Sequence, residues 1–209
     1  MQNKNNISAK SSKSNIELKK SLRKDILSRR KKLNEDDYFL ANNIIIENVE
    51  NLLACLKNET PSKKRVAGLY WPMKGEPDLV KLIINSNWRI ALPKVRGVKM
   101  DFMTYKIGEQ LELSMGRGVR QPQNNITLSP VVIIIPGLAF SIKGDRLGFG
   151  AGHYDRYFDK LGKEKDITKE KDVIKIGVCF DENLYEHLPN EPHDVKLNYI
   201  ITEKTIIAL

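Results

Sequence analysis

The chain of 209 residues is long enough for one domain with a sizeable core, and its 41% hydrophobic and 29% charged residues are ordinary for a globular protein. No apolar run approaches the roughly 20 residues of a membrane helix, and the start lacks the apolar stretch of a secretory signal, so we expect a cytoplasmic protein without a membrane partner. The net charge of +9 lies entirely in residues 1–32, which hold 11 Lys/Arg and two Asp/Glu, whereas residues 33–209 hold 24 of each. A body without basic bias or base-stacking motifs argues against a nucleic-acid partner.

The N-terminal part begins with a polar stretch and continues into two predicted helices. Residues 1–15 are mostly Asn, Lys and Ser, so we expect a flexible basic tail, followed by a single domain over residues 16–209. Apolar residues near helical spacing predict an amphipathic helix over 16–32. Asn34, followed by three acidic residues, predicts the N-cap of a second helix that extends to about Leu56.

Strands and helices alternate in the rest of the chain. Residues 131–135 form a continuous apolar, β-branched run, which is typical of a central strand covered on both faces. This alternation predicts an α/β fold, a mostly parallel sheet flanked by helices. The other predicted strands are 66–70, 89–92, 101–106, 174–179 and 199–202; helices are predicted from Pro77 to Ser86 and over 154–161, and a surface loop over 162–172.

A glycine-rich segment over residues 144–155 follows the central strand and leads into a predicted helix. Its glycines allow the backbone to approach an anion, and the helix N-terminus adds partial positive charge. Arg146 offers a planar fork for phosphate oxygens, and Asp155 is close enough in sequence to help hold a metal ion. The segment has neither the Gly-Lys-Ser/Thr of a Walker A loop nor the GxGxxG spacing. We interpret it as a phosphate-binding loop; the alternative is a turn with glycines at positive φ.

Two further segments carry polar residues in suggestive patterns. Lys19 and Arg23 lie four positions apart on one face of the first helix and suit a polyphosphate, although a solvated basic face is the simpler interpretation. The segment from Tyr70 to Asp78 follows a predicted strand, at the edge where open α/β sheets bind ligands. It suits a flat polar heterocycle, or it forms a turn with helix-capping acids.

Together these segments resemble the 5-formyltetrahydrofolate cyclo-ligase family, also called 5,10-methenyltetrahydrofolate synthetases, from about Ile16 to the end. The family hallmark is Pro-Gly-x-x-Phe followed by Gly-x-Arg-Leu-Gly-x-Gly-x-Gly-x-Tyr-Asp-Arg, here residues 136–156. The remaining elements are a Lys-x-x-Leu-Arg-like start at 19–23, Tyr-x-Pro-x-x-x-Glu-x-Asp at 70–78, Leu92-Pro93 and His193-Asp194. The resemblance implies a fold like that of sugar-phosphate isomerases and CoA transferases, and we expect a monomer.

The resemblance implies that ATP phosphorylates the formyl oxygen of 5-formyltetrahydrofolate, with or without a polyglutamate tail. Nitrogen 10 of the folate then attacks the activated carbon, and phosphate leaves to give 5,10-methenyltetrahydrofolate and ADP, with Mg²⁺ required.

Carried over onto matching positions, the resemblance implies three sets of site residues. ATP would be bound by Lys19, Lys20, Ser21, Leu22, Arg23, Arg146, Leu147, Gly148, Phe149, Gly150, Ala151, Gly152, His153 and Tyr154. The folate would be contacted by Met73, Glu76, Asp78, Phe149, Gly150, Ala151, Gly152 and His153. Arg146 and Tyr154 would be catalytic, and Asp155 and Asp194 would hold Mg²⁺.

Two positions depart from the family pattern. His153 stands where most members have Tyr, and a histidine titrates near neutral pH. Gln121 replaces a family carboxylate, which puts the folate contacts of its loop in doubt. These departures leave open an enzyme of the same fold with a different substrate. A nucleic-acid-binding protein driven by the basic N-terminus is the alternative from another class.

Overall fold

The computed structural model describes residues 15–30, 34–85, 87–115, 118–163, 173–191 and 194–209. Residues 1–14 of the predicted tail and most of the predicted surface loop lie outside these ranges. The first helix, α1 (Asn15–Arg30), begins one residue before the expected domain start.

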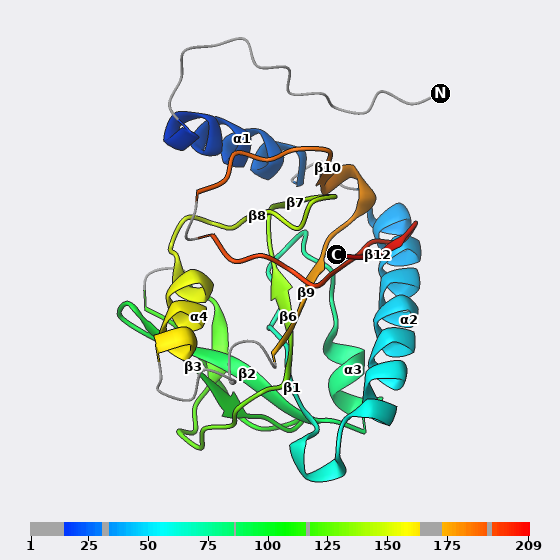
Figure 1. The fold of residues 1–209 in the computed structure, drawn as a ribbon, viewed down its shortest axis with the longest axis vertical. Helices are drawn as coiled ribbons and strands as arrows, with labels where there is room; N and C mark the ends of the chain where they lie inside the picture. The colour runs from blue at the N-terminus through cyan, green and yellow to red at the C-terminus, as the bar shows by residue number, and fades with distance from the viewer. Residues whose placement is uncertain (1–14, 31–33, 86, 116–117, 164–172, 192–193) are drawn as a thin grey trace.

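A seven-stranded, mostly parallel sheet forms the centre of the protein, as predicted (Figure 1). Its inner strands pair in parallel, and only the outer pairs β11–β12 and β2–β3 are antiparallel. In sheet order the strands are β12 (Ile206–Ala208), β11 (Tyr199–Ile201), β9 (Ile174–Val178), β6 (Val132–Pro136), β1 (Val66–Gly68), β2 (Arg89–Arg96) and β3 (Lys99–Thr104).

Helices cover both faces of this sheet. α2 (Glu35–Glu59) and α3 (Val80–Asn85) pack on one face, and α4 (His153–Lys163) packs on the other (Figure 1). Strand β6 is therefore buried on both faces: Val132 and Ile134 belong to the α2 side of the core, and Ile133 and Ile135 belong to the α4 side. The central-strand prediction for 131–135 is therefore confirmed.

Two small sheets complete the fold. One consists of β7 (Ala139–Ser141), β8 (Arg146–Leu147) and β10 (Leu184–Tyr185), and the other of β4 (Leu111–Leu113) and β5 (Arg120–Pro122). Helix α1 crosses the first of these sheets and buries Ile26 against it (Figure 1). Two 3₁₀ turns, Ser62–Lys64 and Asp181–Asn183, link larger elements.

Several predicted boundaries shift for physical reasons. The helix predicted to begin at Pro77 begins at Val80, because the Pro77 carbonyl accepts the Tyr70 hydroxyl at 2.7 Å and the Asp78 side chain caps the Val80 amide at 2.9 Å. β2 continues through Pro93, since beyond β1 it pairs with β3 in a hairpin that turns at Gly97, with φ of +60°.

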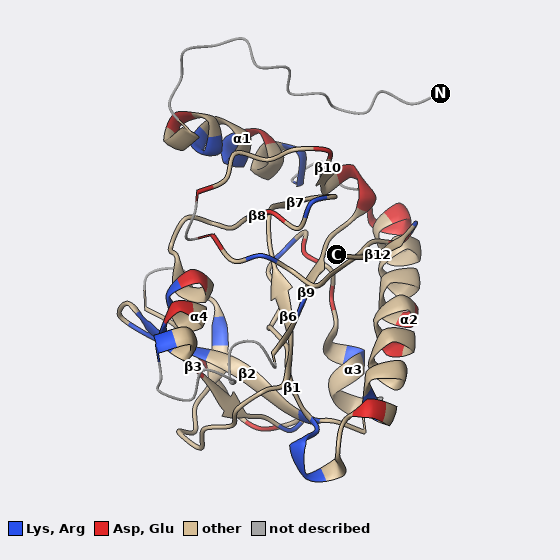
Figure 2. Ribbon diagram, viewed as in Figure 1, with Lys and Arg blue, Asp and Glu red and all other residues tan. Residues whose placement is uncertain are grey.

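The charges follow the pattern expected from the sequence. In Figure 2, Lys and Arg are concentrated on α1, whereas acidic and basic residues are interspersed over the rest of the ribbon. No helix in the described part of the chain is long and apolar enough to cross a membrane.

The Phe102 side chain of β3 packs tightly against the backbone of Gly68 in β1, which gives a stability prediction. A Cβ at Gly68 would lie 2.7 Å from Cε1 of Phe102, a ring that is 1% exposed. We expect Gly68→Ala to lower the free energy of unfolding by about 1–3 kcal/mol through overpacking. In a Phe102→Leu background, urea unfolding should show a smaller cost for the same change. Additive costs in this double-mutant cycle would contradict the steric explanation.

Candidate active site

A cavity of about 530 Å³ lies at the carboxyl ends of β1 and β6, the sheet edge at which open α/β folds bind ligands. Its walls come from α1, the segment after β1, the β2–β3 hairpin, the small β4–β5 sheet, the glycine-rich loop, and Glu191 and Asp194. Segments far apart in the sequence therefore meet at one place.

The glycine-rich loop connects β8 to the first turn of α4 and lines the cavity along its whole length. Gly150 and Gly152 have φ of +90° and +66°, a backbone region that side-chain-bearing residues rarely adopt. The glycines therefore occupy the positive-φ positions of a turn, and they also face the cavity beside a helix N-terminus. The phosphate-binding interpretation stays a prediction.

Arg146 occupies the centre of the site with its side chain only 8% exposed. Its Nη2 lies 3.3 Å from both carboxylate oxygens of Asp155, and its Nη1 donates to the Pro136 carbonyl at 3.2 Å. Its guanidinium carbon lies 5.2 Å from the centroid of the Tyr154 ring. These contacts hold the positive charge in place before any ligand arrives.

Three buried polar atoms on cavity-lining residues lack a hydrogen-bond partner among the described residues: Arg146 Nε, Tyr154 Oη and Glu76 Oε1. Burial raises the pKa of the Tyr154 hydroxyl, which the Arg146 charge only partly offsets, so this hydroxyl remains a proton donor. Buried polar groups are normally paired, so this group of atoms points to a polar ligand.

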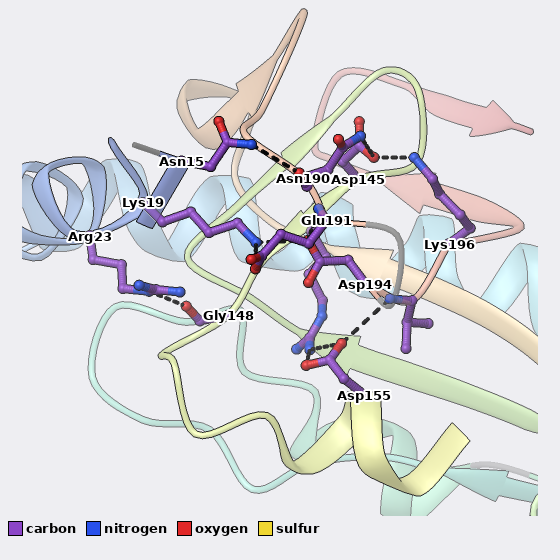
Figure 3. Close-up of polar contacts among 12 residues, drawn as sticks. Asn15, Lys19, Arg23, Asp145, Gly148, Asp155, Asn190, Glu191, Asp194 and Lys196 are labelled. Carbon is purple, nitrogen blue, oxygen red and sulfur yellow. Dashed lines mark hydrogen bonds and ion pairs between the residues drawn. The ribbon is translucent and has the colours of Figure 1, made fainter. Parts of the chain in front are cut away.

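Helix α1 contributes two cations to the same cavity. Lys19, 6% exposed, lies 2.8 Å from Glu191 Oε2 and 2.8 Å from Asp194 Oδ2, and Arg23 Nε donates to the Gly148 carbonyl at 2.9 Å (Figure 3). Burial lowers the pKa of Lys19, but the bonds to Asp194 and Glu191 outweigh burial and raise it. A solvated basic face is therefore the wrong interpretation of this pair.

Three of the residues predicted to bind ATP from this helix lie outside the cavity lining. Lys20 and Ser21 are exposed, and Leu22 packs beside Ile26 in a small apolar cluster. The spacing of the helix explains this division, because positions 19, 23, 26 and 30 fall on the buried face.

The acidic end of the cavity gathers three carboxylates, from Asp155, Glu191 and Asp194 (Figure 3). The Glu191 amide donates to Asp194 Oδ2 at 2.7 Å, and the Val195 amide lies 3.4 Å from Asp155 Oδ1. The sequence analysis missed Glu191, whose only signal is an acid three residues before Asp194. His193 lies outside the described residues.

The segment after β1 carries two acids, Glu76 and Asp78, which were both predicted to contact the folate but have different roles in the structure. Met73 and Glu76 line the cavity, and Glu76 is 2% exposed with Oε2 accepting from the Met73 amide at 3.0 Å. Asp78 lies outside the lining, because Asn42 of α2 binds its backbone and its carboxylate caps α3. One acid faces the site and the other is a helix cap.

The two departures from the family pattern have structural partners. Gln121 Oε1 accepts from the Val95 amide at 2.9 Å, and its Nε2 donates to Glu112 at 3.2 Å, a bond that a carboxylate would not make. His153 Nδ1 lies 3.2 Å from Arg156 Nη2.

Carboxylate oxygens suit a hard cation such as Mg²⁺, which usually binds one or two carboxylates together with substrate phosphates. Asp155 and Asp194 suit this mode of coordination, and in this structure they pair with Arg146 and Lys19. The described residues contain no group of three or more His, Cys, Asp or Glu side chains that could hold a metal ion.

Comparisons with known proteins identify what this arrangement resembles. A model of the 5-formyltetrahydrofolate cyclo-ligase family matches residues 15–203. The 5-formyltetrahydrofolate cyclo-ligase of Mycoplasma genitalium is 30% identical over 186 residues, which cover 88% of this chain and 96% of that protein. The Saccharomyces cerevisiae enzyme is 33% identical over 86 residues, and this match covers 40% of this chain and only 39% of the yeast protein.

A solved structure supports the same relationship. The 5,10-methenyltetrahydrofolate synthetase of Aquifex aeolicus superposes with a TM-score of 0.72 at 29% identity, covering 91% of this chain and 92% of that one.

The acidic end of the cavity depends on a buried carboxylate outside it. Asp145, 4% exposed, binds Ser141, Asn190 and Lys196, and so ties the segment that carries Glu191 and Asp194 to the β7–β8 turn (Figure 3). Burial raises the pKa of Asp145, but bonds from Lys196, Asn190 and Ser141 outweigh burial and hold it below its ordinary value.

We expect Asp145→Asn to lower the free energy of unfolding at pH 7 by about 1–3 kcal/mol, the cost of weakening a buried bonded carboxylate. A depressed folded pKa stabilises above the ordinary value near 3.9, so the difference from wild type should shrink as pH falls below about 4. Urea unfolding at several pH values measures this. The matched control Asp159→Asn, in an exposed pair with Lys163, should cost under about 0.5 kcal/mol, and an equal cost would contradict the role of Asp145.

Proposed function

Because the chain belongs to the 5-formyltetrahydrofolate cyclo-ligase family, we propose that it catalyses the ATP-dependent cyclisation of 5-formyltetrahydrofolate to 5,10-methenyltetrahydrofolate. The observation that carries the proposal is the group of buried atoms on Arg146, Tyr154 and Glu76 that have no hydrogen-bond partner among the described residues and lie around one cavity. They offer two donors and one acceptor, placed beside a glycine-rich loop and a helix N-terminus that suit phosphate.

The nucleotide end of the cavity is the side where α1 meets the glycine-rich loop. Lys19 and Arg23 bring positive charge from the helix, and the backbone of residues 148–152 lies beside them. Arg146 lies between this end and the far wall, so it can contact the phosphoryl group that is transferred. Phosphoryl transfer depends mainly on positioning and charge neutralisation, which these residues supply.

The folate end is the side formed by the segment after β1. Trp71 and Met73 offer flat and adaptable apolar surface there, and Glu76 Oε1 is an acceptor for ring N–H groups of the reduced pterin. Tyr154 offers its unpaired hydroxyl as a donor beside Arg146. Phe149 to His153 lie between the two ends, as a loop that contacts both substrates must.

In the proposed reaction the formyl oxygen attacks the terminal phosphorus of ATP, and ADP leaves. Nitrogen 10 then forms a bond to the formyl carbon and loses its proton to the departing phosphate, as the carbon–oxygen bond to that phosphate breaks. Arg146 stabilises charge on the transferring phosphoryl oxygens, and the buried site keeps water from the activated intermediate.

Mg²⁺ would be held by Asp155 and Asp194 and, when bound, would neutralise phosphate charge. The chain's own residues already contact both carboxylates, since Arg146 pairs with Asp155 and Lys19 pairs with Asp194 in the absence of ligand.

The alternative of a nucleic-acid-binding protein receives little support from the described part of the basic helix. Lys19, Arg23 and Arg30 of α1 all turn inward, to carboxylates or backbone carbonyls of the protein itself. They are therefore occupied in contacts within the protein rather than displayed on its surface.

The activity test is direct. Purified protein with Mg·ATP and 5-formyltetrahydrofolate should generate the absorbance of 5,10-methenyltetrahydrofolate. Arg146→Ala and Asp155→Ala should each lower kcat by at least about 100-fold, the scale for losing one preorganised charge contact. Lys163→Ala, which removes an exposed cation of α4, is the matched control and should act like wild type. No product at saturating substrates would refute the activity, and near-normal rates of both variants would refute the assigned roles.

A further inference from the structure

Arg30 closes α1 and is a third cation on its inward face, although no motif pointed to it. The residue is 6% exposed and lies behind the cavity wall rather than in the lining. Most other charged residues of this helix are exposed or half-buried, so the burial of Arg30 requires an explanation.

The side chain of Arg30 contacts three separate segments that form the cavity. Its Nη2 donates to the Gly137 carbonyl at 2.7 Å, just after β6, and its guanidinium carbon lies 5.8 Å from the centroid of the Phe149 ring. Its Nη1 lies 3.9 Å from Glu76 Oε1. A Cβ at Gly75 would lie 3.2 Å from the Arg30 Cβ, so the loop before Glu76 packs directly on the arginine stem.

Helix docking alone does not explain a charged residue here. Burial lowers the pKa of Arg30, against the attraction of Glu76, and its Nε has no hydrogen-bond partner among the described residues. An apolar side chain of similar volume usually stabilises such a position as well as a buried ion pair or better. We therefore look for a role of the Arg30 charge in the site rather than in the stability of the fold.

The group that needs the charge is Glu76. Burial raises its pKa to about 7, against the hydrogen bond from the Met73 amide and the charge of Arg30. Tyr38, Tyr70 and Tyr154 interact with it electrostatically. Burial raises the pKa of each hydroxyl, so the three tyrosines are neutral near pH 7.

Asp78, two residues along the same segment, directs its carboxylate to the Val80 amide. Among these neighbours of Glu76, only Arg30 provides a positive charge.

We propose that Arg30, which touches no substrate itself, is a positioning residue for the folate end of the cavity. It presents the charged Glu76 carboxylate to the ring N–H groups of the substrate and fixes Phe149 beside them. This inference rests on the proposed function, because it assigns the partner of Glu76 Oε1 to the folate. Without Arg30, Glu76 takes up a proton, and the acceptor becomes a donor facing other donors.

Binding affinities as a function of pH test the proposal. Arg30→Met keeps the stem and removes the charge, and Arg30→Lys restores a cation. Because Glu76 binds when ionised, wild-type affinity for 5-formyltetrahydrofolate should rise as pH increases through about 7. In Arg30→Met this rise should move to higher pH. If the pKa of Glu76 rises by one unit, its ionised fraction at pH 7 falls from about one half to about one eleventh, so the Kd at pH 7 should increase by about fivefold. The Kd for ATP should change by less than about twofold, a small fraction of that unit.

A matched control lies next to Arg30 on the same helix. Arg29 donates to the Tyr185 hydroxyl at 2.6 Å and pairs with Asp25, without contacting Glu76. Arg29→Met should therefore keep the wild-type pH dependence, and Arg30→Lys should recover part of it. An unchanged profile in Arg30→Met, or an equal shift in Arg29→Met, would overturn the proposal.

Two outcomes separate the inference from the proposed function. If wild-type protein does not bind 5-formyltetrahydrofolate, both fail together. If it binds with an affinity that does not depend on pH, only the role of Arg30 fails. Should Arg30→Met not fold, Glu76→Gln decides, because it should bind with weaker, pH-independent affinity; persistent pH dependence in that variant would refute the role of Glu76.

Discussion

The docking of α1 is the contact on which the site depends. Ile26, fully buried among Leu138, Leu147 and neighbouring side chains of the small sheet, is the apolar anchor. A 16-residue helix with this many charges has little stability alone, so it forms because it docks. The anchor places positions 19, 23 and 30 on the same face, toward three different walls of one cavity. Folding of the helix and assembly of the site are therefore a single event.

Each buried cation of the site is matched by a carboxylate from another element or segment. Lys19 pairs with Glu191 and Asp194, Arg146 with Asp155, and Arg30 with Glu76. An unpaired buried charge costs several kcal/mol, so this pairing lets the protein carry charge in the absence of ligand. In the proposed function, bound phosphates would add negative charge beside Lys19 and Arg146, which would leave their carboxylates available to a divalent cation. The Arg30 pair lies at the other end, where the ligand is expected to be an uncharged ring.

The sequence predicted the central sheet because burial on both faces leaves an unbroken apolar run, as in residues 131–135. It missed the β7–β8–β10 sheet, whose strands have two or three residues and no periodicity to detect. It also described Lys19 and Arg23 as solvated, since nothing local reveals Glu191 and Asp194 more than 170 residues away. Likewise only Asn42 of α2 decides that Asp78 caps a helix while Glu76 faces the cavity. The family was recognised from motifs and is confirmed, whereas the tail, the monomeric state and the cytoplasmic location stay predictions.

Arginine side chains contact the backbone of the glycine-rich loop from both sides. Arg23 binds the Gly148 carbonyl and Arg156 binds the Ala151 carbonyl, so two carbonyls of the loop turn toward guanidinium groups. In a planar trans peptide the following N–H points the opposite way, and these amides therefore point away from the arginines. A Cβ at Gly152 would lie 2.7 Å from Arg156 Nη1, so a side chain there would displace the arginine. The glycines thus satisfy two requirements, close approach of the arginines and the positive φ that lets successive amides converge on an anion.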